Sequence, residues 1–436
     1  MDAIRKLQLL GDQMNLEPAE ESDSAPRPLG DSSSPVASPH VVAPCGHSPE
    51  ELRRVFDENL SSPDGAPSAS LRSAQDAAVR RGAGHEAKKF LPIHQAAMPG
   101  GKRIALLKTL LTSACERDCY YCPFRAGRDY RRATFKPEEM AQVFSQMNRA
   151  GVAEGLFLSS GIAGGGVRTQ DRLIDTADVL RRKLEFQGYL HLKLMPGVER
   201  DQVLRAMQLA DRVSINLEAP NTERLKRLAP HKIFLEELLQ PLQWAEEIRR
   251  TLTPHKTIKG RWPSTVTQLV VGAVGESDLE ILTTTEYVTR QLRLQRVYFS
   301  AFNPVPDTPL ESQPPENPWR QHRLYQASFL LRDYGFDLED MPFTSEGRLP
   351  LEVDPKLGWA RMNLSETPVE VNRADRRELL RVPGIGPKGA DAILLARRRG
   401  KLRELRDLQT LGVLAARAAP FILLDGRLPT QQLRLF

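Results

Sequence analysis

The chain has 436 residues, of which 40 % are hydrophobic and 27 % charged, and its formal net charge is +6. This length allows two or three domains, and the composition is that of a globular protein. No apolar run reaches about 18 residues and no secretory signal opens the chain, so we expect a cytoplasmic protein with no membrane partner. Four cysteines are too few for a disulfide scaffold in so long a chain.

The N-terminal region over 1–88 is rich in Ser, Pro, Ala and Gly. Such a composition cannot bury enough apolar surface to offset the entropy of ordering the chain. We therefore predict that this region is largely disordered, apart from a short helix capped by Ser48.

From about residue 105, short apolar runs alternate with longer amphipathic segments. The runs predict strands at 104–113, 155–160, 189–195, 212–218, 266–272 and 296–302. The amphipathic segments predict helices at 137–149, 170–186, 199–209, 235–251, 277–292 and 318–334. Six strand-then-helix units over 89–345 indicate a parallel sheet with helices outside it. Two α/β folds remain open at this point: a partial (β/α)6 barrel of the TIM type and an open doubly wound sheet.

Three of the cysteines form a C-x3-C-x2-C group directly after the first predicted strand: Cys115, Cys119 and Cys122. In a barrel this position is the first loop of the catalytic face. Three thiolates so close together can hold a metal or an iron–sulfur cluster. Structural zinc usually takes four ligands, and the fourth would have to come from Cys45 or His47 in the tail. Three cysteines instead leave one iron of a [4Fe–4S] cluster open, and an unrelated cysteine cluster is the alternative.

This spacing resembles the signature of the radical S-adenosylmethionine (SAM) superfamily. The resemblance implies that the three cysteines bind a [4Fe–4S] cluster whose open iron takes the amino and carboxylate groups of SAM. It further implies that the reduced cluster cleaves SAM to methionine and a 5′-deoxyadenosyl radical. A one-electron donor such as a flavodoxin or ferredoxin is an implied partner.

The residues that the resemblance assigns to SAM follow the cysteines in the expected chain order: Tyr121, Ser159, Ser160, Gly161, Asn216, Glu218, Gly272 and Gly275. In order, they match the adenine side, the methionine amino group ("SSG" instead of the commoner Gly-Gly-Glu), the ribose hydroxyls and the adenosyl group. Taken singly, each has an ordinary alternative, because glycines at strand ends are turns, Ser160 fits a helix cap and Asn216 fits a loop contact. No residue is assigned to the reaction on the substrate.

The C-terminal region over 366–436 follows a linker at 346–365 and holds 14 Lys and Arg against 8 Asp and Glu. It therefore carries the whole net charge of +6, which indicates a polyanion-binding module.

A G-x-G-x-x-G pattern lies in this region, with Lys388 beside its glycines Gly384, Gly386 and Gly389. A dinucleotide site would need a strand before the pattern, whereas the preceding "RADRRELLRV" is typical of a helix that begins after Asn372. Helix, Pro-Gly-Ile-Gly-Pro turn and helix predict a helix-hairpin-helix module. These four residues would then bind a sugar-phosphate backbone.

A weaker second copy of the module turns at 411–413. The predicted shared core of the two copies is Leu379, Leu380, Ile385, Ile393, Leu394, Leu405, Leu408 and Leu411. The alternative is that paired hairpins serve folding or protein docking without nucleic acid.

Over about 90–426 the chain is similar to a family of radical SAM proteins assigned to DNA modification or repair. The stretches that carry this resemblance are "GLFLSSG", "GYLHLKLMPG", "LAP" at 228–230, "RVYFSAF" and "RVPGIGPK". It implies a partial radical SAM barrel followed by an all-α helix-hairpin-helix domain, acting on DNA in preference to RNA. It also implies a uracil-DNA-glycosylase-like partner. Two alternatives stay open: an enzyme that modifies RNA or tRNA, and a non-catalytic iron–sulfur redox sensor that binds nucleic acid.

Overall fold

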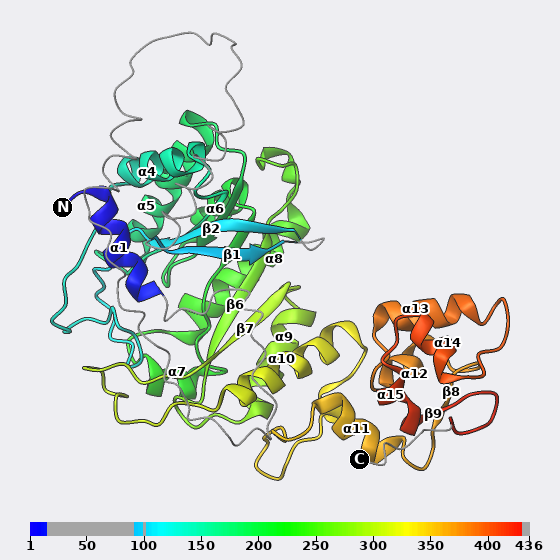
Figure 1. Ribbon diagram of the computed structural model, residues 1–436. Coiled ribbons are helices and arrows are strands. Elements are labelled where there is room, and N and C mark those ends of the chain that lie inside the picture. The colour runs from blue at the N-terminus through cyan, green and yellow to red at the C-terminus, as the bar shows by residue number, and fades with distance from the viewer. Residues whose placement is uncertain (15–90, 99–101, 430–436) are drawn as a thin grey trace, which may run out of the picture. The chain divides into compact units, whose positions relative to one another are not determined.

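The computed structural model describes residues 1–14, 91–98 and 102–429. Most of the region predicted to be disordered, including the helix predicted after Ser48, lies outside these ranges. Within them, Ala3–Met14 forms helix α1, an element that the composition of the region did not predict. Its buried Leu7 and Leu10 are part of the core, and α1 packs against strand β2 (Figure 1).

Within the described ranges, seven strands form one sheet in the order β1-β2-β3-β4-β5-β6-β7. The strands are β1 (Ile93–Ala97), β2 (Arg103–Leu110), β3 (Gly155–Ser159), β4 (Tyr189–Lys193), β5 (Arg212–Ser214), β6 (Ser264–Val271) and β7 (Arg296–Ala301). The order follows the chain without reversing, as in a partial barrel, whereas a doubly wound sheet reverses its strand order at a switch point. The sheet therefore decides between the two predicted folds in favour of the partial barrel.

The register places the ends of neighbouring strands side by side. β1 runs antiparallel to β2, with Ile93 opposite Leu107. β2 and β3 are parallel, and Leu110 lies opposite Ser159, so both strands end at the same edge. β6 and β7 are also parallel, with Val271 opposite Ala301. The carboxyl ends of parallel strands are where a (β/α) fold builds its site.

Two compact units divide the chain. The first comprises 1–116, 129–213 and 253–263, and the second comprises 117–128, 214–252 and 264–436. The division of the sequence into 1–88, 89–345, 346–365 and 366–436 stays a prediction. In the described ranges, none of the helices has the length and apolar character that a bilayer crossing requires.

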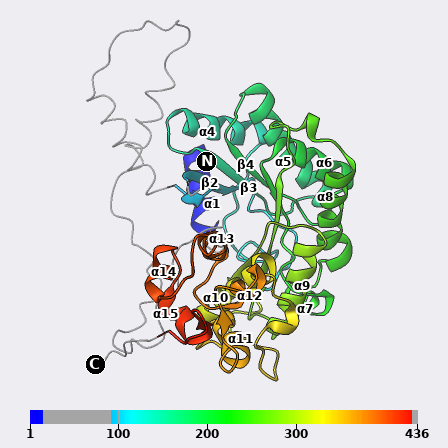
Figure 2. The same cartoon turned by 90° about the vertical axis from the view of Figure 1, so that its right-hand side faces the viewer.

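In the first unit, three helices pack in a row, α4 against α5 and α5 against α6 (Figure 2). They are α4 (Pro137–Arg149), α5 (Gly166–Asp178), which continues as the π-helical turn η1 (Val179–Lys183), and α6 (Arg200–Leu209). Pro137 at the start of α4 suits a first helical turn, whose N–H groups have no intrahelical partner. All five residues of β3 are buried, as expected of a parallel strand that is covered on both faces. A short 3-10 turn, η3 (Pro254–Lys256), also belongs to this unit.

In the second unit, α9 (Asp278–Arg290) and α10 (Pro318–Asp333) pack against each other and against β7. Ser277 caps α9, and Glu280 completes the capping box, which is the pattern that "SDLE" indicates in sequence. The remaining helices before the C-terminal region are α7 (Thr222–Leu228), η2 (Phe234–Leu239), α8 (Gln240–Thr251), η4 (Leu338–Asp340) and α11 (Pro355–Asn363).

The C-terminal region is a cluster of short helices around its own apolar core (Figure 1). Its elements are β8 (Val369–Glu370), α12 (Arg376–Arg381), α13 (Pro387–Ala396), α14 (Leu405–Thr410), α15 (Ala415–Ala418), η5 (Ala419–Phe421) and β9 (Ile422–Leu423). The eight leucines and isoleucines predicted as core all belong to this cluster, five of them buried and three at its margin. Asp375 caps α12, so the helix begins three residues later than Arg373, where the sequence had placed its start.

Candidate active site

In the first unit, the segment that ends in Cys115 lies against the residues that leave β3. The Gly161 N–H donates to the Thr112 carbonyl over 2.7 Å, and the Glu116 N–H donates to the Ile162 carbonyl over 2.8 Å. The Ile162 N–H in turn lies 3.5 Å from the Cys115 sulfur. The predicted cluster ligand Cys115 and the predicted SAM contact Gly161 are therefore neighbours in this unit.

Glycine is required at position 161 because a side chain would not fit at this contact. A Cβ atom there would overlap the Ala114 carbonyl oxygen and lie 3.2 Å from the Cβ of Cys115. Ser159 is buried at the end of β3, and the Ser160 hydroxyl donates to the Gly161 carbonyl over 2.7 Å. The "SSG" sequence thus forms the tight crossing of the two strand exits.

Glu116 holds the glycine-rich loop that follows. Its carboxylate accepts the N–H groups of Gly164 and Gly165, at 3.0 Å and 3.1 Å. Both glycines have positive φ, a backbone conformation that residues with a side chain rarely adopt. The Cys115–Glu116 pair therefore contacts both ends of the loop between β3 and α5.

In the second unit, the rest of the cysteine loop, Arg117–Arg128, is tied down by ion pairs and backbone bonds. Arg117 pairs with Glu237 at 2.5 Å, and the Tyr120 N–H donates to the Leu228 carbonyl over 2.8 Å. The Cys122 N–H donates to the Cys119 carbonyl, and the Phe124 N–H lies 3.4 Å from the Cys122 sulfur. Cys119 is buried and Cys122 half-buried.

A buried ion pair lies beside this loop. The Lys232 Nζ is 2.5 Å from the Glu218 Oε1, and the two side chains are 8 % and 7 % exposed. Burial acts to lower the pKa of Lys232, but the negative charges of Cys119, Glu218 and Cys122 raise it by more, so the net pKa lies above its ordinary value. Lys232 is therefore a fixed cation near two of the three cysteines.

Glu218 has a second distinguishing feature, its backbone. Its φ is 65°, and its N–H and carbonyl bond to Gln268 and Val270 of β6. Its Oε2 is buried without a hydrogen-bond partner. The predicted ribose contact thus has a lysine on one oxygen and nothing on the other. Asn216, two residues earlier, is half-buried.

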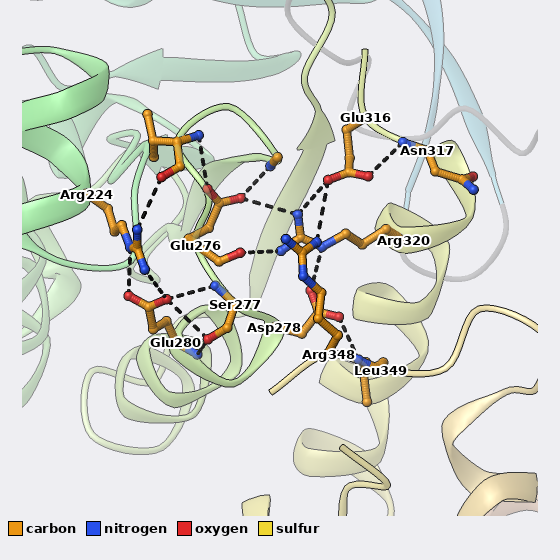
Figure 3. A network of polar contacts seen from close by, with 12 residues as sticks. Arg224, Glu276, Ser277, Asp278, Glu280, Glu316, Asn317, Arg320, Arg348 and Leu349 are labelled. Carbon is orange, nitrogen blue, oxygen red and sulfur yellow. Dashed lines mark hydrogen bonds and ion pairs between the residues drawn. The ribbon is translucent and has the colours of Figure 1, made fainter. Parts of the chain in front are cut away.

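The turn that leaves β6 is organised by a buried carboxylate (Figure 3). Glu276 accepts the N–H groups of Gly272 and Val274. Gly272 has φ 92°, and a Cβ atom there would overlap the side chain of Glu316. The two glycines assigned to the adenosyl group, Gly272 and Gly275, therefore belong to one fixed turn.

Arg320 of α10 bonds to this turn (Figure 3). Its guanidinium pairs with Asp278 at 2.7 Å and with Glu316 at 2.6 Å, and it donates to the Glu276 carbonyl over 2.7 Å. Arg320 is 2 % exposed. Burial acts to lower its pKa, but Asp278, Glu316 and Glu276 raise it, so the side chain stays charged.

A second pair supports the same turn. Arg224 of α7 binds both oxygens of Glu280, at 2.9 Å and 3.0 Å, and donates to the Val274 carbonyl over 3.2 Å. The hydrogen bond from Arg224 lowers the pKa of Glu280 to about 2, with further bonds from Ser277 and Asn221. This geometry is the bidentate arginine–carboxylate pairing that fixes orientation as well as charge.

Comparison with known proteins relates this part of the chain to a protein family. Residues 109–286 match the model of the radical SAM superfamily. The chain carries a radical SAM domain. It is an enzyme domain, and its match begins in β2 and ends in α9, so it contains all three cysteines and every residue assigned above to SAM.

Solved structures that resemble the radical SAM chain are distant. Methylornithine synthase (PylB) has 14 % identity and a TM-score of 0.42, over 60 % of this chain and 70 % of its own. The FeFe-hydrogenase maturase HydG from Carboxydothermus hydrogenoformans has 13 % identity and a TM-score of 0.42, over 65 % of this chain and 63 % of its own. Coproporphyrinogen III oxidase (HemN) from Escherichia coli has 16 % identity and a TM-score of 0.34, over 51 % of each chain. No curated protein matches the sequence.

The donor set of the radical SAM domain fits a [4Fe–4S] cluster. Soft thiolates are the ligands that such clusters take. Two of the three sulfurs lie near backbone N–H groups, those of Ile162 and Phe124, and a cation lies beside the loop. Among the described residues, no three Cys, His, Asp or Glu side chains are grouped to hold a single metal ion. In a cluster, each thiolate binds its own iron.

The residues predicted to bind SAM divide between the two units. The first unit brings Ser159, Ser160 and Gly161 to Cys115, and the second holds Tyr121, Asn216, Glu218, Gly272 and Gly275 with Cys119 and Cys122. Their contacts with SAM stay predictions. Lys232, Glu116 and Arg320 were not among the residues predicted from sequence. Only Lys232 had a signal, because it follows the "LAP" segment that carries part of the resemblance.

The turn between α12 and α13 shows where the four predicted phosphate-binding residues lie. Gly384 has φ 85°, and a Cβ there would lie 2.5 Å from the Leu414 carbonyl oxygen. A Cβ added at Gly389 would lie 3.1 Å from a methyl carbon of Val413. These two glycines therefore allow the first turn to approach the second. Gly386 precedes α13, and Lys388 is exposed in the first turn of that helix.

Proposed function

We propose that this protein is a radical SAM enzyme that acts on DNA. The observation that carries the proposal is the radical SAM match over 109–286 in a chain whose last 71 residues hold its whole net positive charge. The three cysteines would hold a [4Fe–4S] cluster. When bound, the cluster and SAM supply reductive cleavage of SAM and a radical able to remove hydrogen from an unactivated position.

The described contacts suggest what the chain itself contributes. Gly161 and Gly272 let the backbone approach closely at the exits of β3 and β6, and Arg320 fixes the second of these turns. Cys119 and Phe124 of the cysteine loop are buried, and such burial would help to shield a reactive intermediate from water.

DNA as substrate class is supported by the C-terminal helices. A glycine turn leads into α13, whose first N–H groups and exposed Lys388 face no carboxylate in the described hydrogen bonds. Backbone N–H groups at such a helix start bind phosphate, and glycine turns allow the backbone to come close. Arg398, Arg399, Arg403 and Arg406 add exposed positive charge on the neighbouring segment. Such contacts hold the sugar-phosphate backbone and do not select a sequence.

The cofactor half of the proposal is tested by replacing one ligand. Anaerobically reconstituted wild-type protein is expected to bind about four irons per chain and to form 5′-deoxyadenosine from SAM after reduction. Cys119→Ala should lose both the iron and the formation of 5′-deoxyadenosine. The control is Met362→Ser, a change at an exposed residue of α11, which should keep both. Normal iron content in Cys119→Ala would refute the ligand assignment.

The nucleic-acid half is tested by the salt dependence of binding. For a wild-type complex with duplex DNA, the logarithm of the binding constant should fall linearly with the logarithm of salt concentration. Lys388→Gln should weaken binding uniformly across sequences and reduce that slope by about 1, since one phosphate contact is lost. Lys226→Gln, an exposed change on α7, is the control. Tighter binding of tRNA than of DNA at every salt concentration would assign the enzyme to RNA instead.

A further inference from the structure

Lys232 is a buried lysine to which neither the superfamily match nor the sequence pattern gives a role. It follows α7 and is held by the Glu218 carboxylate at 2.5 Å. A charge that is this deeply buried is costly unless it is compensated. Glu218 compensates it with only one oxygen, since Oε2 has no hydrogen-bond partner.

The remaining compensation comes from the cysteine loop. The preceding residue, His231, donates its N–H to the Asp118 carboxylate and accepts a bond from Arg117 at its carbonyl, so Lys232 follows a residue that is bonded to the cysteine loop. The charges of Cys119, Glu218 and Cys122 all raise the pKa of Lys232. The nearby Arg117 is already paired with Glu237, and Asp118 with His231. Lys232 is thus a cation that is held by one carboxylate and lies near the loop whose two sulfurs are predicted to bind iron.

We propose that Lys232 sets the reduction potential of the cluster by stabilising its reduced state electrostatically. The inference rests on the proposed cofactor. One electron from a flavodoxin- or ferredoxin-type donor lowers the charge of the cluster by one and breaks no bond. Where groups such as Cys119 and Lys232 are buried, a fixed positive charge favours the more negative state, and net charge is one of the factors that set cluster potentials.

Glu218 acts in the opposite direction in this scheme. Its carboxylate neutralises part of the lysine charge that the cluster would otherwise experience. Removing the carboxylate should therefore make reduction easier, and removing the lysine should make it harder. A purely structural role for the pair would give the same sign for both changes.

The experiment is a redox titration of the reconstituted full-length protein, with dithionite as electron donor and the paramagnetic signal of the reduced cluster as readout. At a fixed potential, Lys232→Gln should reduce the ratio of reduced to oxidised cluster at least tenfold, a shift of about 59 mV for one electron. Glu218→Gln should raise that ratio, and Lys232→Arg should keep it near the wild-type value. Lys226→Gln on the exposed face of α7 is the matched control.

The two possible failures are distinguishable. Wild-type protein that binds no cluster refutes the proposed function. Wild-type protein with a cluster whose potential is unchanged in Lys232→Gln, or lowered in Glu218→Gln, overturns only the role of Lys232. If Lys232→Gln does not retain iron, the opposite shift expected for Glu218→Gln still decides, because that variant keeps the cation.

Discussion

At the residue scale, Gly161 determines how closely the segment after β3 approaches the segment that ends in Cys115. Its backbone conformation is one that any residue adopts, so only its lack of a side chain explains its presence. The obstacle is the backbone carbonyl of Ala114, directly before the cluster ligand Cys115, and backbone cannot swing aside as a long side chain can.

Gly161→Ala should therefore destabilise the apoprotein by about 1–3 kcal/mol, the usual cost of forcing extra volume into a packed site. Urea unfolding at neutral pH measures this cost. Gly400→Ala is the control, because a Cβ at Gly400 meets nothing within 4 Å. Equal midpoints for the two variants would contradict the steric role of Gly161.

A titrating lysine gives a second residue-scale prediction. Lys356 of α11 donates to the Ile385 carbonyl over 2.6 Å and lies over the ring of Tyr334. Burial lowers its pKa to about 7, while Asp354 raises it and Arg417 lowers it further. The unfolded chain keeps a lysine pKa near 10.4, so between pH 7 and 10 the unfolded state binds more protons and stability rises with pH.

In wild-type protein, the free energy of unfolding should gain up to about 1.4 kcal/mol per pH unit from this group across that window. Lys356→Met should lose the gain, so its stability curve should be flatter than that of the wild type from pH 7 to 10. Parallel curves for the two proteins would show that Lys356 titrates normally.

At the scale of elements, Arg320 links α10 to the turn between β6 and α9 and thus connects two parts of the second unit. The link consists of buried ion pairs, with Glu276 and Asp278 fully covered. Such pairs add little net stability when intact, but the loss of one partner leaves an uncompensated buried charge.

Arg320→Met should accordingly cost about 3–5 kcal/mol of stability, measured by urea unfolding. Arg332→Met on the same helix breaks exposed contacts, namely the pair with Asp333 and a bond to the Gln295 carbonyl, and should cost at most about 1 kcal/mol. Similar costs for both variants would mean that the Arg320 network does not hold the turn.

The elements themselves were largely predictable from sequence, for reasons that differ along the chain. α4 has the predicted bounds, 137–149, because a proline start and an amphipathic period agree there. β1 was missed because "IHQAA" is short and weakly apolar, and its pairing with β2 is a tertiary event. Helix α7 was missed for its length of seven residues.

The candidate site was predictable only where motif residues are close in sequence or stand at strand ends. The cysteines are close in sequence, and the residues at the exits of β3 and β6 stand at strand ends. Lys232 and Arg320 met neither, because a lone lysine or arginine in sequence is typical of a solvated surface. Their burial depends on Glu218 and Glu276, partners 14 and 44 residues away.

At the scale of the whole molecule, charge and chemistry occupy different stretches of the chain. Residues 1–365 have no net charge, whereas the last 71 residues carry +6. The radical SAM match ends at residue 286, well before that basic region. An enzyme organised in this way would hold its substrate by one part and react with it by another, which is the basis of the proposed action on DNA.

Transfer of deuterium from DNA to 5′-deoxyadenosine decides whether DNA is the substrate. Reconstituted enzyme would be incubated anaerobically with SAM, dithionite and duplex or single-stranded DNA that is deuterated at its carbon positions, with deuterated RNA in parallel. We expect deuterium in the 5′-deoxyadenosine formed with DNA, and none with RNA or with Cys119→Ala. Abundant 5′-deoxyadenosine without deuterium from any DNA would contradict hydrogen abstraction from DNA.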